Sequence, residues 1–483
     1  HFTDRRQRQM CIRDRLGPIC FLVSFLFDTP TGMSDNGFRL LGVIVWMAIW
    51  WISEVVPIAV TALLPIVLFP SCEIMSIQET GANYGHKYIF LFIGGFIIAN
   101  AIQKWNLHQR IALNIILRLG SSTDKIILGF MIATGFLSMW ISNTATTVMM
   151  LPIALSVISQ IKDHPESKEN EQQLFGKALM LAVAYSASAG GIATLIGTPP
   201  NLIFAGFIED NLNTEISFFQ WFKVGLPISV SLIVIIWIYL TQIAFKLPKK
   251  GFPGGKKEVQ KLLFEMGPMK NEEKKIMLIF LVTILCWISR KYIITPFIPH
   301  FDDSMIAITS AIFLFIIPSK NNRKPLLEWN EAVKIPWGIL ILFGGVLSIA
   351  NGFQTTQIDL WIGDQLSSIT ITNALIVLLL VISSVNFITE MSSNMATTAM
   401  LLPIMIPLSE VIGVHPYLLL VSTTLAASCA FMLPVATPPN AVVFGSKLLT
   451  IRDMVKAGFL INVISIIIIL IVVNYGLPLF WNL

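Results

Sequence analysis

Residues 124–160 read DKIILGFMIATGFLSMWISNTATTVMMLPIALSVISQ, and the polar residues Ser142-Asn143-Thr144 interrupt this apolar stretch. A helix needs about 20 residues to cross a bilayer, so the stretch is too long for one crossing. Within hydrocarbon, an unwound backbone is tolerated only where it is buried in protein or lines a polar cavity. We therefore interpret the stretch as two half-helices that meet at the polar break, and predict a re-entrant hairpin.

The chain repeats this feature. A second apolar stretch spans residues 371–411 and is broken at Ser393-Asn394, which recurs 251 positions after Ser142-Asn143. Residues on both sides of the two breaks also match at this constant offset. This self-similarity predicts that the chain contains a duplication.

A second motif recurs after each hairpin. Residues 198–201 read TPPN, and residues 437–440 read TPPN again, 239 positions later. Two prolines remove two backbone donors, and the residue before a proline is pushed out of the helical region. We therefore predict broken helices over residues 175–208 and 415–446, with freed carbonyls available as ligands.

The composition of the whole chain is typical of a membrane protein. Of the 483 residues 55% are hydrophobic and 13% charged, with a mean hydropathy of +0.74, whereas soluble chains carry about 25% charge. Long apolar stretches exclude a β-barrel, whose strands are short and alternating. Basic residues cluster between these stretches, so the net charge of +5 does not indicate a nucleic-acid partner. We expect an all-α, multi-pass protein of the cell membrane.

Loop charge predicts how the two copies are oriented. Lys and Arg flank the first hairpin on both sides, whereas residues 353–371 and 410–416 around the second contain neither. Because basic loops stay in the cytoplasm, the copies should open on opposite sides, as inverted repeats. Only Arg290 and Lys291 fall on the wrong side of this count.

These patterns together predict the domain organisation. Residues 1–15 differ in composition from the rest and are interpreted as adventitious or disordered. Residues 16–245 form the first repeat, 246–275 a Lys-rich cytoplasmic connector, and 276–483 the second repeat. The cysteines show no paired spacing, which indicates neither a disulfide framework nor a thiolate metal site; they are Cys11, Cys20, Cys72, Cys286 and Cys429.

The polar breaks are suited to binding a cation and an anion together. Hydroxyl, amide and backbone oxygens bind hard cations, and the scarcity of carboxylates favours sodium over calcium. Helices that begin just after each Asn direct N–H groups and positive dipole ends at an anion. No Lys or Arg lies within the motifs, so co-bound cations would supply the positive charge. This is a physical basis for symport.

Several alternatives stay open. Ser and Thr in membrane helices often bond back to the preceding turn or join helices. Glu54 and Glu390 lie close to apolar surroundings and could form a proton relay or serve as hydrogen-bonded structural carboxylates. A membrane-embedded hydrolase would need a nucleophile or metal ligands that converge in the bilayer, and the sequence indicates none, so we expect no enzymatic activity. A passive anion channel would conduct without sodium.

The four motifs in this order resemble the divalent anion/sodium symporter family of dicarboxylate, citrate and sulfate carriers. The resemblance is carried by Ser142-Asn143-Thr144, Gly197 with the TPPN at 198–201, Ser393-Asn394, and Ala436 with the TPPN at 437–440. It covers nearly the whole chain beyond residue 15. It implies about eleven membrane helices plus two re-entrant hairpins, a homodimer held by scaffold helices, and transport domains that move as an elevator.

The resemblance also implies the site residues. One sodium site would comprise Ser138, Ser142, Asn143 and Gly197. The other would comprise Thr389, Ser392, Asn394 and Ala436. Substrate contacts would come from Ser142, Asn143, Thr144, Ser393, Asn394, Thr437 and Pro438. Sodium ions would be co-transported, and no organic cofactor is implied.

Two residues depart from the family pattern. Ser392 stands where Ala is usual, and Met395 where Thr or Val is usual. A thioether accepts hydrogen bonds only weakly, so Met395 predicts an apolar wall that suits the carbon chain of a C4 acid, unless it points into the hairpin core. We expect sodium-coupled symport of a dicarboxylate such as succinate, malate or fumarate. Sulfate or citrate symport, and exchange without sodium, remain alternatives.

Overall fold

The computed structural model describes residues 15–162, 169–247, 253–320, 324–367 and 373–481. All regular secondary structure in these ranges is helical, as the sequence predicts. The prediction for residues 1–15 falls almost wholly outside the described residues, as does Cys11. The other four cysteines are free.

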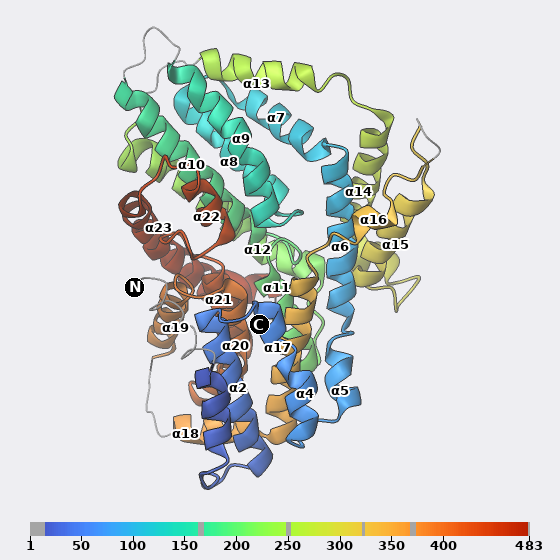
Figure 1. The fold of residues 1–483 in the computed structure, drawn as a ribbon, viewed down its shortest axis with the longest axis vertical. Coiled ribbons are helices and arrows are strands. Elements are labelled where there is room, and N and C mark those ends of the chain that lie inside the picture. Colours follow the sequence, from blue (N-terminus) through green and yellow to red (C-terminus); the bar gives the residue numbers. More distant parts are fainter. Residues whose placement is uncertain (1–14, 163–168, 248–252, 321–323, 368–372, 482–483) are drawn as a thin grey trace.

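The first half of the chain is a series of helices of very different lengths (Figure 1). A short helix, Arg15–Ser24, comes first. It is followed by α2 (Asp35–Ser53), α3 (Ile58–Thr61), α4 (Leu64–Ser71), α5 (Ile77–Asn83), α6 (Lys87–Lys104), α7 (Leu107–Leu119), α8 (Thr123–Ser138), α9 (Asn143–Lys162), α10 (Glu169–Gly191), α11 (Pro199–Leu212), α12 (Phe218–Ile238) and η1 (Tyr239–Ala244).

The second half repeats much of this order after a connecting helix. Its helices are α13 (Pro253–Glu265), α14 (Asn271–Ser289), η2 (Arg290–Ile294), α15 (Asp303–Ile316), α16 (Trp329–Ala332), α17 (Trp337–Thr356), α18 (Ile358–Ser367), α19 (Ala374–Ile388), α20 (Asn394–Val411), α21 (Pro416–Ala427), α22 (Pro438–Phe444), α23 (Ile451–Ile471), η3 (Val472–Gly476) and α24 (Leu477–Trp481). The helices α6 to α9 correspond to α17 to α20, and α10 and α11 correspond to α21 and α22.

The breaks in the helices fall at the polar motifs. α8 ends at Ser138 and α9 begins at Asn143, while α19 ends at Ile388 and α20 begins at Asn394. Each TPPN motif starts a new helix with its prolines in the first turn, where a missing N–H costs nothing. The chain unwinds for seven residues before α11 and for ten before α22, from the end of the preceding helix.

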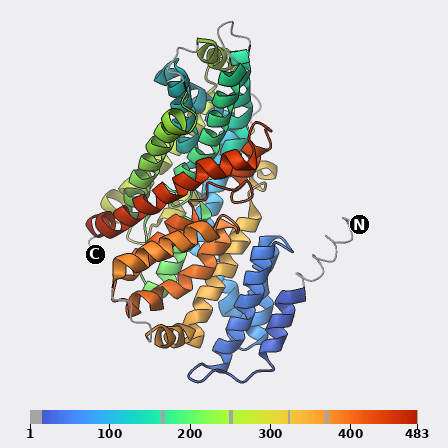
Figure 2. The same cartoon turned by 90° about the vertical axis from the view of Figure 1, so that its left-hand side faces the viewer.

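The two hairpins lie on opposite sides of the molecule's centre. In Figure 1, α8 and α9 occupy the upper half of the long axis, and α19 and α20 lie in the lower half. The side view in Figure 2 shows the same order, with the helices around α9 above and those around α20 below. The two breaks therefore approach each other near the middle of the fold.

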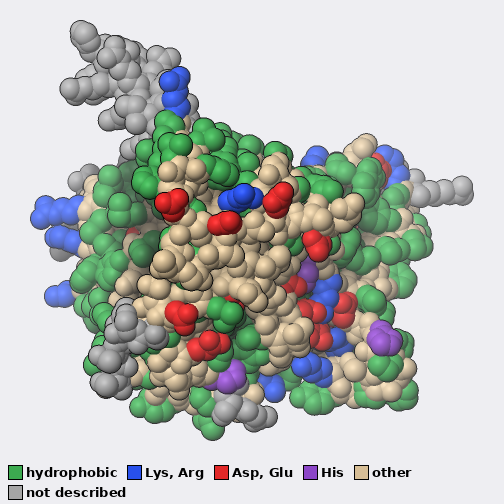
Figure 3. Space-filling model, turned by 90° about the horizontal axis from the view of Figure 1, so that it is seen from below, with side chains coloured by type: hydrophobic (Ala, Val, Ile, Leu, Met, Phe, Trp, Pro, Cys, Tyr) green, Lys and Arg blue, Asp and Glu red, His purple; other side chains and the backbone are tan. Residues whose placement is uncertain are grey.

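The described chain contains enough apolar helices for a multi-pass membrane protein. Seven helical segments are long and apolar enough to cross a bilayer, and five further apolar helices are shorter. Seen from below (Figure 3), hydrophobic side chains gather around the rim, while most acidic side chains lie on the face between them. This distribution suits a rim in contact with lipid and an end in contact with water.

One of the shorter apolar segments spans residues 58–71. The structure divides it into α3 and α4, with the break at Ala62 and Leu63. Pro65 lies in the first turn of α4 and lacks the N–H that would continue a helix from α3.

Arg290, which falls on the wrong side of the loop-charge count, has its charge neutralised by two acidic side chains. Its side chain is only 5% exposed and forms ion pairs with Glu215 at 2.6 Å and Asp303 at 2.8 Å. A buried and paired guanidinium differs from a free loop charge, because its charge is compensated within the fold. Lys291 contacts the side-chain oxygen of Gln220 at 3.4 Å.

Glycine allows a close contact between two helices in the first repeat. A Cβ added to Gly190 of α10 would overlap the backbone oxygen, Cα and carbonyl carbon of Gly135 in α8. The two backbones therefore touch directly, and neither can move away without displacing its own hairpin or broken helix.

We predict that Gly190→Ala destabilises the protein by about 1–3 kcal/mol or more, because backbone atoms cannot yield to the added methyl group. The thermal unfolding midpoint of the purified protein in detergent measures this. Gly81→Ala is the matched control, since Gly81 also lies in a helix but has nothing within 4 Å of an added Cβ. Equal midpoints for the two variants would contradict the close contact.

Candidate functional site

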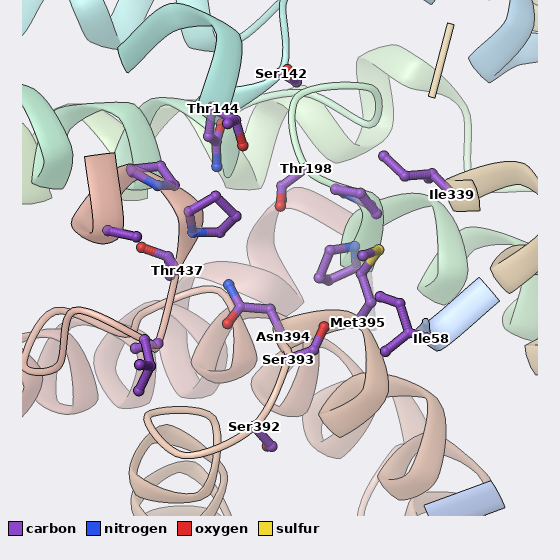
Figure 4. Close-up of a pocket in the computed structure, with 18 of the residues that line it drawn as sticks. Ile58, Ser142, Thr144, Thr198, Ile339, Ser392, Ser393, Asn394, Met395 and Thr437 are labelled. Carbon is purple, nitrogen blue, oxygen red and sulfur yellow. The ribbon is translucent and has the colours of Figure 1, made fainter. Parts of the chain in front are cut away.

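A cavity of about 660 Å³ lies where the breaks of both repeats meet. Figure 4 shows Ser142 and Thr144 reaching it from the first hairpin and Ser393 and Asn394 from the second. The unwound segments before α11 and α22 complete the lining from each side. Cavities of this size hold small-molecule ligands in proteins.

The structure brings nearly all the expected residues to this cavity. All seven expected substrate contacts line it: Ser142, Asn143, Thr144, Ser393, Asn394, Thr437 and Pro438. Of the expected sodium ligands, Gly197, Ser392 and Ala436 line it as well. Ser138 and Thr389 do not line it but are fully buried directly behind the two tips.

The first hairpin tip places two neutral oxygens side by side. The Ser138 hydroxyl donates a hydrogen bond to Asn143 Oδ1 at 2.5 Å. Gly191 faces the same amide, because a Cβ there would lie 2.5 Å from Asn143 Oδ1. A Cβ on Gly197 would in turn overlap the Gly191 carbonyl. Hydroxyl, amide and carbonyl oxygens thus crowd together, which is a donor set for a hard monovalent cation.

The second hairpin tip repeats this arrangement. The Thr389 hydroxyl donates to Asn394 Oδ1 at 2.8 Å and lies 3.0 Å from the Ala427 carbonyl. The Ser392 hydroxyl is occupied, since it bonds to Thr397 Oγ1 at 2.6 Å and to the Ile388 carbonyl. Ser392 could therefore contribute its backbone carbonyl, as the usual Ala would, but not a free hydroxyl.

The Asn of each TPPN motif ties the unwound segment in place. Asn201 Nδ2 donates to the carbonyls of Gly191 and Thr194, at 3.3 and 2.8 Å. Asn440 Nδ2 donates to the carbonyls of Ala430 and Leu433, at 3.4 and 3.0 Å, which are the equivalent positions of the second repeat. The motif therefore starts the helix that follows the break, and its Asn also satisfies carbonyls that the break frees.

Glu390 is a structural carboxylate. It is 3% exposed and accepts hydrogen bonds from the backbone N–H groups of Phe431, Met432 and Leu433 at 2.7 to 2.9 Å. Asn462 Nδ2 adds a fourth bond at 2.8 Å. The carboxylate thus links the second hairpin tip to the unwound segment before α22. Of the two roles that the sequence left open, the geometry favours the structural one.

Helix ends supply the positive potential in the cavity. No Lys, Arg or His lines the cavity among the described residues, and Glu54 is the one ionisable side chain that does. The helices α9, α11 and α20 begin at the cavity, so their first N–H groups and positive dipole ends are directed at it. Such a site can hold an anion without a cationic side chain.

Met395 lines the cavity and is half-buried. In Figure 4 it lies on the same side as Ile58 from α3. The structure therefore favours the apolar wall over the alternative in which Met395 points into the hairpin core.

Sequence reasoning missed several residues of the site. Gly191 and Thr194 are ordinary residues in an apolar stretch, yet Gly191 contacts the Asn143 amide and Thr194 Oγ1 donates to the Met139 carbonyl at 2.5 Å. The repeat could have identified Gly191, which aligns with the buried Ala430 at the TPPN offset. Within the described residues, no group of three or more His, Cys, Asp or Glu side chains could hold a metal ion.

The sequence is similar to known transporters over nearly its full length. Residues 14–482 match the family described as the sodium:sulfate symporter transmembrane region. A protein named sodium-dependent dicarboxylate transporter SdcS from Staphylococcus saprophyticus is 44% identical over 469 residues. One of the same name from Staphylococcus aureus (strain USA300) is 45% identical over 470 residues. Each alignment covers 96% of this chain and 90% of the relative.

Two solved structures share the fold at low sequence identity. The YdaH transporter of Alcanivorax borkumensis superposes with a TM-score of 0.59 at 11% identity, over 93% of this chain and 99% of its own. MtrF of Neisseria gonorrhoeae superposes with a TM-score of 0.55 at 13% identity, over 91% and 95%. These likenesses show the fold alone.

We predict that Glu390→Gln disorganises the second tip. A Gln side chain keeps one accepting oxygen but turns an NH2 group toward N–H donors, and each buried donor left unpaired costs about 1–3 kcal/mol. The thermal unfolding midpoint in detergent should fall. Glu410→Gln is the control, since Glu410 is an exposed acid at the far end of the same hairpin. A midpoint for Glu390→Gln as high as that of the control would contradict the structural role.

Proposed function

Because the chain belongs to the sodium:sulfate symporter family, we propose that it couples the uptake of a small dicarboxylate, such as succinate, malate or fumarate, to the influx of sodium. It is a multi-pass membrane transporter and not an enzyme, as its named relatives are transporters. One observation carries the proposal. Each hairpin tip pairs a hydroxyl with an Asn amide oxygen, and both tips face one cavity that none of the described basic side chains lines.

We propose two sodium sites, one at each tip. The first uses Ser138, Ser142, Asn143 and Gly197. The second uses Thr389, Ser392, Asn394 and Ala436. The hydroxyl–amide pairs support this assignment, because their oxygens already lie within 2.8 Å of each other and need little rearrangement to share a cation. Oxygen ligands without a carboxylate suit a monovalent ion.

The anion would bind between the two tips. Its contacts would come from Ser142, Asn143, Thr144, Ser393, Asn394, Thr437 and Pro438, and hydroxyl, amide and backbone N–H donors of the first six would hold its carboxylates. Pro438 has no N–H and would contribute only packing. The same Asn side chains would serve both ligands, with Oδ1 toward sodium and Nδ2 toward the anion. Binding of either ligand would thereby orient the amide for the other, which is how sodium and anion become coupled.

Three alternative functions differ from symport in what they predict. A passive anion channel would not accumulate substrate against a gradient. Exchange without sodium would need a second anion inside. Sulfate or citrate symport would use the same cavity, but the apolar side formed by Met395 and Ile58 offers neither of them a hydrogen bond. We therefore favour a C4 dicarboxylate.

We further propose how the chain is organised for transport. Residues 16–245 form one repeat, 246–275 a cytoplasmic connector and 276–483 the inverted second repeat. The hairpins and broken helices would carry the site as an elevator past the helices that supply Ile58, Phe92 and Ile339. The homodimer that the resemblance implies belongs to the same proposal, and light scattering of the purified protein in detergent would test it.

We predict that succinate uptake into proteoliposomes depends on sodium with more than first-order kinetics, because two ions bind for each anion. Asn143→Ala or Asn394→Ala should lower the apparent affinity for sodium and for succinate about 10- to 100-fold. This is the loss expected from about 1.5–3 kcal/mol for one charge-assisted hydrogen bond.

The control for both variants is Asn211→Ala. Asn211 Nδ2 makes one local bond to the Phe207 carbonyl at the end of α11 away from the cavity. Accumulation of succinate without sodium would overturn symport. Full activity of Asn143→Ala and Asn394→Ala would refute the assignment of the two Asn side chains.

We predict that Met395→Thr raises citrate uptake relative to succinate uptake, because a hydroxyl replaces an apolar group at the cavity wall. An increase of about 3- to 10-fold in the ratio is expected, with sodium dependence retained. Initial rates of both radiolabelled acids, measured in the same vesicles, give the ratio. An unchanged ratio in a normally expressed variant would remove the reason for preferring dicarboxylates.

A further inference from the structure

The cavity contains an acidic side chain that the proposed function does not use. Glu54 is the one ionisable residue among the described residues that line the cavity. It caps the C-terminal end of α2, with φ 46° and ψ 37° in the left-handed region. Its carboxylate is exposed, and it neither accepts a hydrogen bond nor forms an ion pair in the described part of the chain.

Glu54 differs in this respect from Glu390. The Glu390 carboxylate has four donors and a clear structural task. Glu54 has none, although the left-handed conformation is unfavourable for any residue with a Cβ. No contact within the described fold therefore accounts for a carboxylate at this position.

The end of α2 adds to the negative charge. The last carbonyls of a helix carry a partial negative charge, and the last turn of α2 has no basic residue to offset it. The positive ends of α9, α11 and α20 also meet the cavity. The cavity thus combines the positive ends of helix N-termini with the negative charge of Glu54 and the end of α2.

A fixed negative charge near an anion site penalises a ligand in proportion to the ligand's charge. Two sodium ions balance a dianion but not a trianion, which would add a charge beside Glu54. We infer that Glu54 is a charge filter that admits dicarboxylates and disfavours tricarboxylates. The inference rests on the proposed function and adds a specificity-determining residue outside both hairpins.

Two inhibitors of similar shape that compete with succinate allow the effect of ligand charge to be measured separately from the effect of ligand size. Tricarballylate and 3-methylglutarate share one carbon skeleton, and the central carboxylate of the first is a methyl group in the second. Each is titrated against sodium-driven uptake of radiolabelled succinate in alkaline buffer, where all carboxylates are ionised. The ratio of their inhibition constants then reports the cost of one additional charge.

In Glu54→Gln, we expect the inhibition constant of tricarballylate to fall about 3- to 10-fold relative to that of 3-methylglutarate. Glu54→Asn is a second neutral variant, chosen because Asn tolerates the left-handed conformation. It should behave as Glu54→Gln does. Glu54→Asp retains the charge and should retain the wild-type ratio, as should Glu410→Gln, whose acid lies outside the cavity lining.

The possible failures are distinguishable. Wild-type protein that takes up succinate without sodium, or not at all, would overturn the proposed function and this inference with it. Sodium-driven uptake with an unchanged competitor ratio in both neutral variants would overturn the inference alone. A weaker apparent sodium affinity in those variants, without a change in the ratio, would also overturn it and would identify Glu54 as a cation-recruiting residue instead.

Discussion

An unwound backbone inside a membrane must find partners for every freed carbonyl and N–H, and this constraint organises the whole site. Each repeat unwinds twice, once at its hairpin tip and once before its TPPN helix. The side chains that satisfy the second break, Asn201 and Asn440, donate to equivalent carbonyls in the two repeats.

The two repeats meet this constraint with different chemistry. In the first, Gly135 and Gly190 allow direct contact between backbones. At the equivalent positions of the second, Asn386 Nδ2 donates to the Cys429 carbonyl at 2.7 Å. The second repeat also has the Glu390 carboxylate where the first has Met139. The duplicated fold has thus kept its geometry, although the close packing of glycines in the first repeat is replaced by buried hydrogen bonds in the second.

The same geometry explains how an anion can be held without a basic side chain. Helix N-termini and amides supply partial positive charge, which is weaker than a guanidinium and leaves the anion dependent on co-bound cations. A Lys or Arg in the cavity would hold the anion on its own and uncouple it from sodium. Neutral donors are therefore a requirement of coupling in the mechanism proposed above.

The sequence alone determined the helical class and the positions of the breaks. Ser142-Asn143-Thr144 interrupts an apolar stretch and Pro199-Pro200 starts a helix, and each motif determines the conformation of its own backbone. The duplication also indicated that the motifs belong to one site, and the structure places them around one cavity. The tertiary structure decided the interactions of buried and charged side chains whose partners lie far away in the chain.

The four donors of Glu390 lie more than 40 residues away from it, and the two acids that neutralise Arg290 come from the connection between α11 and α12 and from the start of α15. Glu54 faces the cavity only because α2 ends there. Local patterns determine where a helix breaks, but burial and electrostatic compensation are properties of the packed fold.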